Sequence, residues 1–83
     1  MTHVLHDLHA EFPEDGEILH RLKLNDAHFQ KVSEAYSTVN HEIHRIEAGI
    51  DAASDTRLED LKKQRLALLD DVATLIARAK ETA

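Results

Sequence analysis

Histidine is the residue type that could carry chemistry in this chain, because it is unusually frequent and regularly spaced. Seven His occur among 83 residues. His3, His6 and His9 recur at every third position, and His41 and His44 are also three residues apart. Imidazoles one helical turn apart can share a metal ion such as zinc. One hypothesis is therefore metal binding or buffering through the His-rich N-terminus and the His41/His44 pair.

The neighbours of these histidines favour a plainer interpretation. One turn beyond His44 the chain offers Ala48, which cannot bind a metal, and only Glu47 beside it could do so. We therefore predict no bound metal and no cofactor. A further hypothesis is pH sensing, because protonation of all seven His would carry the net charge from −6 to about +1.

The composition argues against several other functions. The absence of Cys removes thiolate zinc sites, thiol catalysis and disulfides, and a net charge of −6 argues against a nucleic-acid binder. There is no apolar stretch of about 18 residues and no signal-peptide pattern, so we expect no membrane contact and a cytoplasmic location. Adjacent acids such as Asp70 and Asp71 diverge on a helix, and no nucleophile constellation occurs. We predict that the protein is not an enzyme.

The few turn-forming and capping residues divide the chain into helices. Pro13 suits a first helical position, Asn25 and Asp26 suit a helix N-cap, and Gly49 suits a left-handed C-cap. Ser54, Asp55 or Thr56 would cap the last helix, and Thr56 has capping-box spacing to Glu59. We predict one domain, residues 1–83, with 1–12 flexible or a short helix, 14–24 a short helix, 26–48 a long helix, 49–54 a turn and 55–80 a long helix.

Two long segments repeat apolar residues at alternating spacings of three and four, which is the heptad pattern of a coiled coil. The first series is Phe29, Val32, Tyr36, Val39, Ile43, Ile46 and Ile50, and the second is Leu58, Leu61, Arg65, Leu68, Val72, Leu75 and Ala79. The linker is short, so the helices must run antiparallel, with Phe29 opposite Leu75 and Ile46 opposite Leu58. The predicted fold class is all-α, an antiparallel helical hairpin of coiled-coil type with a short N-terminal helical segment.

The last helix carries a second apolar stripe that needs its own neighbour. This stripe consists of Leu66, Leu69, Ala73 and Ile76. Either the N-terminal segment folds onto it, or two copies of the chain pair into a helix bundle. We favour self-association.

Arg65 is the one charged residue at a predicted seam position. It lies opposite Val39, and Asn40 and Glu42 flank it on the facing helix. A charge at this position is costly unless its stem packs and its head reaches a partner. Arg65 either forms a polar layer that fixes the register or projects toward a partner protein.

Short motifs along most of the chain resemble the YdcH-like family of small bacterial proteins. They are Phe12-Pro13-Glu14, Ile18, Leu22-Lys23, Asp26, Phe29, His41-Glu42-Ile43, Arg45, Glu47, Leu61-Lys62-Lys63, Arg65-Leu66, Leu68 and Asp70-Asp71-Val72. Two positions depart from the family pattern, where Ala27 replaces a common Pro and Leu69 replaces a usual Lys. The resemblance implies a bacterial cytosolic helical hairpin of unknown function, with no catalytic residue or cofactor to carry over.

We expect this chain to act by protein–protein association, as a homo-oligomer or as a small adaptor for a protein partner. The candidate contact surface comprises His41, Arg45, Glu47, Lys62 and Arg65. The alternative is the metal-binding function described above.

Overall fold

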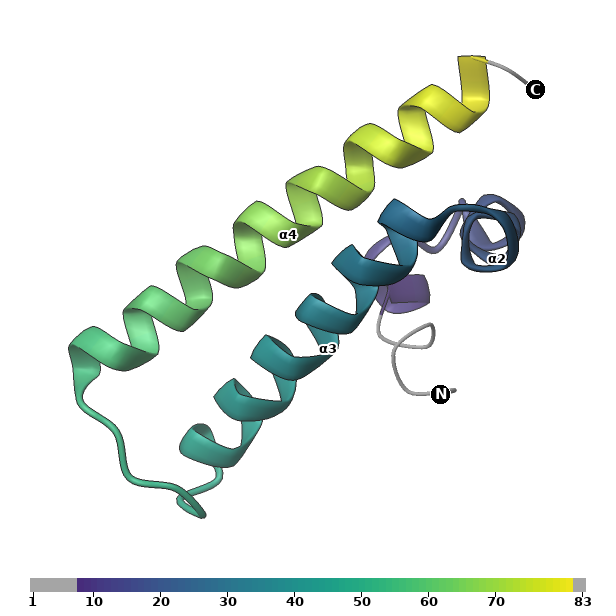
Figure 1. Cartoon of the computed structure of the whole chain (residues 1–83). Coiled ribbons are helices and arrows are strands. Elements are labelled where there is room, and N and C mark those ends of the chain that lie inside the picture. Colours follow the sequence, from purple (N-terminus) through teal and green to yellow (C-terminus); the bar gives the residue numbers. More distant parts are fainter. Residues whose placement is uncertain (1–7, 82–83) are drawn as a thin grey trace.

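Two long antiparallel helices form the body of the molecule (Figure 1). The computed structural model describes residues 8–81, in which α2 spans Gly16–Asn25, α3 spans Ala27–Glu47 and α4 spans Asp55–Glu81. Residues 8–11 add one helical turn, and residues 8–81 contain no strand. The predicted all-α class is confirmed.

The seam between α3 and α4 confirms the predicted hairpin. Its buried side chains form two clusters, of which the first contains Leu8, Leu19, Phe29, Val32, Tyr36, Val72, Leu75 and Ile76, and the second contains Val39, Ile43 and Leu61. Phe29 and Leu75 share the first cluster, as their opposite positions in the predicted register require. The two heptad series therefore supply most of the buried side chains of both clusters.

Gly49 ends α3 because it can adopt a backbone conformation that other residues avoid. Its φ is +79°, in the left-handed region. The Gly49 N–H donates to the carbonyl of Ile46 at 3.1 Å, and the Ile50 N–H donates to the carbonyl of Arg45 at 2.9 Å. These two bonds form a Schellman motif, which satisfies carbonyls that the helix end would leave without partners.

Side-chain caps begin both long helices. The Asp26 carboxylate accepts a hydrogen bond from the Phe29 N–H at 2.9 Å, as its N-cap position predicts. At α4 the Ser54 hydroxyl accepts from the Arg57 N–H at 3.1 Å. Ser54 is therefore the cap among the three candidates, and Thr56 lies within the helix, so the predicted capping box with Glu59 was wrong.

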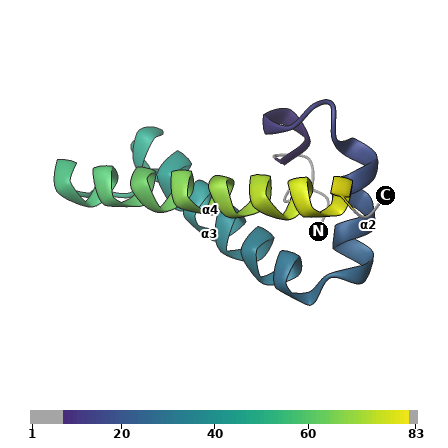
Figure 2. The same cartoon turned by 90° about the horizontal axis from the view of Figure 1, so that it is seen from above.

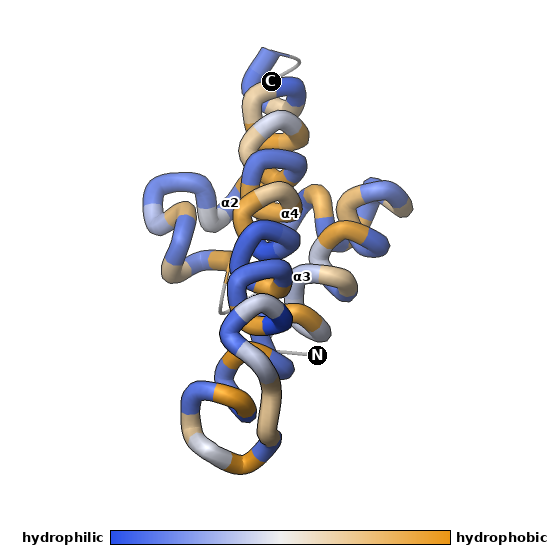
Figure 3. The backbone as a smooth tube through the Cα atoms, turned by 90° about the vertical axis from the view of Figure 1, so that its left-hand side faces the viewer, coloured by the Kyte–Doolittle hydropathy of each residue, from blue (hydrophilic) through white to orange (hydrophobic). Residues whose placement is uncertain are grey.

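The N-terminal segment covers part of the second apolar stripe of α4. Figures 1 and 2 show α2 lying across the open end of the hairpin, where Lys80 of α4 pairs with Asp15 at 3.0 Å. Leu8 and Leu19 are fully buried in the first cluster beside Ile76. Hydrophobic and hydrophilic residues alternate around the coils of α4 (Figure 3), as expected for an amphipathic helix. However, Leu66 stays 61% exposed, so the cover is incomplete.

Replacing Gly49 should destabilise the hairpin, because a Cβ is strained at φ +79° even though nothing lies within 4 Å of it. We expect Gly49→Ala to lower the free energy of unfolding by about 1 kcal/mol in urea denaturation. Gly16→Ala is the matched control, since its Cβ would meet the His9 ring at an ordinary 3.5 Å and alanine favours a helix. Equal losses from both changes would contradict the left-handed cap.

Candidate protein-contact site

Arg65 makes a polar contact across the seam of the hairpin. Its Nη1 donates to the Asn40 side-chain oxygen at 2.9 Å, and Asn40 is only 6% exposed. This layer lies where the two apolar clusters meet, because Tyr36 belongs to one cluster and Val39 to the other. The side chain of Arg65 is half-buried. Asn40 was one of the two residues predicted to flank Arg65, so this part of the register argument is confirmed.

The second predicted neighbour of Arg65 has a different partner. Glu42 accepts a hydrogen bond from Arg57 at 2.6 Å, one turn into α4. Within residues 8–81 no carboxylate forms an ion pair with the Arg65 guanidinium. Because a guanidinium carries five N–H donors and Asn40 accepts from one, Arg65 has donors that bond to no other side chain of residues 8–81.

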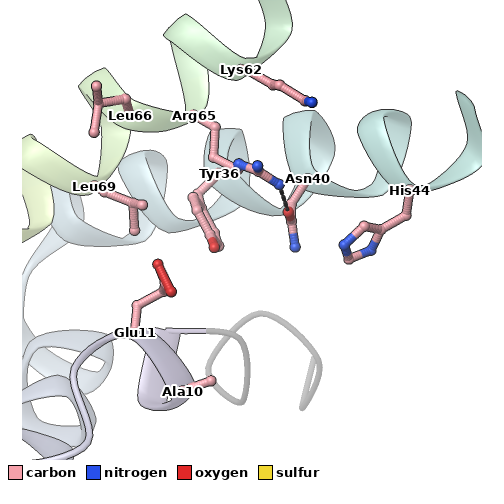
Figure 4. Close-up of a pocket in the computed structure, with 9 residues that line it drawn as sticks. All are labelled: Ala10, Glu11, Tyr36, Asn40, His44, Lys62, Arg65, Leu66 and Leu69. Atoms are coloured by element: carbon pink, nitrogen blue, oxygen red, sulfur yellow. Dashed lines mark hydrogen bonds between the residues drawn. The ribbon is translucent and has the colours of Figure 1, made fainter. Parts of the chain in front are cut away.

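A cavity of about 470 Å³ opens beside this polar layer (Figure 4), and we call it the Arg65 groove. Its lining comes from the N-terminal turn, α3 and α4, and consists of Ala10, Glu11, Tyr36, Asn40, His44, Lys62, Arg65, Leu66 and Leu69. Figure 4 shows Arg65 reaching from α4 toward Asn40, with Leu66 and Leu69 further along the same helix. The groove therefore combines the apolar side chains of Leu66 and Leu69 with two cations, Arg65 and Lys62, and one carboxylate, Glu11. Its cations outnumber its carboxylates, which suits a ligand that is both apolar and acidic.

Four of the five residues predicted as contacts line the groove or form internal ion pairs, and among residues 8–81 His41 does neither. Lys62 and Arg65 line the groove. The Lys62 ammonium also lies 3.3 Å from Glu47, and both side chains are nearly half exposed. Arg45 binds Asp51 through two hydrogen bonds, of 2.8 and 3.1 Å, in the loop after α3. His41 is exposed on α3 and lines no part of the groove.

The Arg45–Asp51 pair fastens the loop to the end of α3. The hydrogen bond from Arg45 lowers the pKa of Asp51 below its usual 3.8, with the charges of Arg45 and His41 adding to the effect. The same hydrogen bond raises the pKa of Arg45. The two side chains are 41% and 44% exposed, so the pair positions the loop without a buried charge.

The described histidines do not assemble into a metal centre. In residues 8–81 no group of three His, Asp or Glu side chains is placed to hold a metal ion. His41 and His44 are both exposed on α3, and His3 and His6 lie outside the described residues. His9 is half-buried, and its Nε2 atom makes no hydrogen bond within residues 8–81.

Sequence reasoning missed the residues that build the groove around Arg65. Tyr36 was assigned only to the core and His44 only to the metal and pH-sensing hypotheses, although both line the groove. Glu11 was not considered, because no periodic spacing links the N-terminal turn to α4. The signal in the sequence that could have indicated the groove was the second apolar stripe. Leu66 follows Arg65 directly, and Leu69 follows it one helical turn later.

A comparison with protein families matches the chain over residues 29–76 to the family described as Protein of unknown function (DUF465). This match takes in nearly all of α3, the loop and most of α4. The chain belongs to this family. Membership agrees with the resemblance to YdcH-like proteins. Comparisons with curated proteins and with solved structures find no match.

The family match covers the hairpin side of the Arg65 groove. Tyr36, Asn40, Arg65 and Leu69 lie within it, whereas Glu11 of the N-terminal turn lies outside it. The family description names no activity. In the part of the chain that the structure describes, no helix has the length and apolarity needed to cross a membrane.

A double-mutant cycle should show that Asn40 and Arg65 stabilise the hairpin together. Arg65→Ala leaves the buried Asn40 oxygen without this donor, so we expect a coupling energy of about 1–2 kcal/mol with Asn40→Ala in urea denaturation. The exposed Glu42–Arg57 pair is the matched control and should couple by less than about 1 kcal/mol. A coupling near zero between Asn40 and Arg65 would show that the cation does not fix the seam.

Acid should remove the contribution of the Arg45–Asp51 pair to stability. The folded-state pKa of Asp51 is below 3.8, so its carboxylate stabilises the folded chain above that value. This contribution disappears as the pH falls through the folded-state pKa. We expect Asp51→Asn to unfold in less urea than the wild type at about pH 7, with the difference vanishing in strong acid.

The control for this pH dependence is the same change in an Arg45→Gln background, where the ion pair is already absent. There Asp51→Asn should leave the urea midpoint unchanged at both pH values. A difference that persists in strong acid would instead assign the effect to the neutral contacts of the loop.

Proposed function

We propose that this chain is a non-enzymatic protein that acts by associating with other protein chains, as a homo-oligomer or as a small adaptor. One observation carries the proposal. Leu66 is 61% exposed at the edge of the Arg65 groove, although it belongs to an apolar stripe in which Leu69 is half-buried and Ile76 is buried. This stripe is only partly covered within the chain. Covering the rest with a second surface removes apolar area from water and therefore lowers the free energy.

The arrangement of the exposed leucines distinguishes this surface from ordinary surface hydrophobicity. Leu24 and Ile50 are exposed to a similar extent, at 64% and 63%. Leu24 lies near the end of α2 and Ile50 in the loop, and neither lines the Arg65 groove. Scattered apolar side chains need no explanation, whereas Leu66 continues into a groove with half-buried Leu69 and Arg65.

The polar lining of the groove supports binding rather than acid–base chemistry. Within residues 8–81 no hydrogen bond joins Glu11, His44 or Lys62 to one another, and Lys62 instead faces Glu47. A general acid and base need such mutual contact or a common sheltered position. Long polar side chains around an apolar wall are the usual composition of an interface rim.

Leu66→Ser tests the proposal, with Leu24→Ser as a control of equal exposure and chemistry. The mass of the purified protein is measured by sedimentation, and proteins that it retains from an extract of its source cells are quantified for all three chains. We expect the wild type and Leu24→Ser to form the same complex, and Leu66→Ser to weaken it about tenfold or more. A monomer that retains the same proteins in all three forms would overturn the proposal.

A further inference from the structure

We infer that the Arg65 groove recognises a carboxylate beside an apolar side chain on a segment of another protein. This inference rests on the proposed function and adds the chemistry of the partner. The groove places Arg65 next to Leu66 on α4, with Leu69 one turn along. A partner side chain of Asp or Glu would meet the guanidinium while a neighbouring Leu, Ile or Phe covers the two leucines.

The charge on Arg65 selects an acidic partner. Arg65 is half-buried as a residue, and its hydrogen bond among residues 8–81 is to the neutral oxygen of Asn40. A partly desolvated cation without a counter-ion gains from a carboxylate, and Arg–carboxylate hydrogen bonds are about twice as strong as neutral ones. Other cations nearby are already paired, since Lys62 faces Glu47 and Arg57 faces Glu42.

The hydrogen bond to Asn40 prepares Arg65 for this role. One Nη atom is held at 2.9 Å by a residue that is only 6% exposed, so the guanidinium plane is anchored before a partner arrives. An anchored side chain loses less conformational entropy on binding than a free surface arginine. Lys63 on the same helix lies outside the groove and has no ion pair within residues 8–81, which makes it the natural comparison.

A second copy of the chain is a less suitable occupant than a separate acidic segment. Two copies each carry a net charge of −6, so they repel over distances comparable to the Debye length. A short segment with one or two acidic residues meets a much smaller repulsion while supplying the same carboxylate. The groove, at about 470 Å³, has room for a few side chains of such a segment.

The probe is a displayed library of short random peptides, selected on the immobilised full chain. We expect the selected peptides to share an Asp or Glu beside a large apolar residue. A synthetic peptide from the selection should bind Arg65→Gln about tenfold or more weakly than the wild type, and should bind Lys63→Gln equally well. Thermal melting followed by circular dichroism verifies that both variants stay folded.

A second peptide, in which an amide side chain replaces the acidic one, completes a double-mutant cycle with Arg65→Gln. Replacing its acidic residue by Asn or Gln should weaken binding to the wild type and have little effect on binding to Arg65→Gln, because the two changes remove one contact. Selected peptides without a shared acid, independent effects of the two changes, or no selection at all would each overturn the inference. If one of these results is obtained and Leu66→Ser nevertheless abolishes the complexes of the intact protein, the proposed association function is retained. The inference that the partner is acidic is then wrong.

Discussion

Arg65 reaches the Asn40 oxygen only because α3 and α4 pack in one register. Apolar clusters lie on both sides of this contact, with Phe29 and Val72 in one and Ile43 and Leu61 in the other. A shift of α4 by one residue would rotate these side chains away from the seam and place a polar neighbour in the core. The polar layer adds a penalty for misalignment, since the buried amide would then lose its donor.

The ion pairs and the loop contacts mainly fix geometry. All four ion pairs among residues 8–81 involve exposed or partly exposed side chains, and such pairs contribute little to the free energy of unfolding. Gly49 and the Arg45–Asp51 pair hold the loop at one end. The N-terminal turn with Leu8 closes the other end and forms the wall of the groove.

Heptad spacing was sufficient to predict the hairpin and the meeting of Asn40 with Arg65, because both follow from local periodicity and one short linker. The groove depends on a different kind of contact. Leu8 packs on the hairpin through tertiary burial that no repeat spacing encodes. The choice of Ser54 as the N-cap similarly depends on the path of the loop before α4. Residue type alone did not determine this choice, because all three candidates are suitable caps.

A leucine in place of Arg65 would suit a purely apolar seam, so the cation costs stability that a simple hairpin need not lose. The position of Arg65 suggests a role that offsets this loss of stability. The guanidinium bonds to Asn40 inside the seam, and Arg65 lines the groove beside Leu66. In the proposed interaction the same side chain would therefore both favour one register and offer donors to a partner. A partner that binds this arrangement binds only the aligned hairpin. Occupancy of the groove would therefore stabilise the fold that creates it, coupling association to the register of α3 and α4.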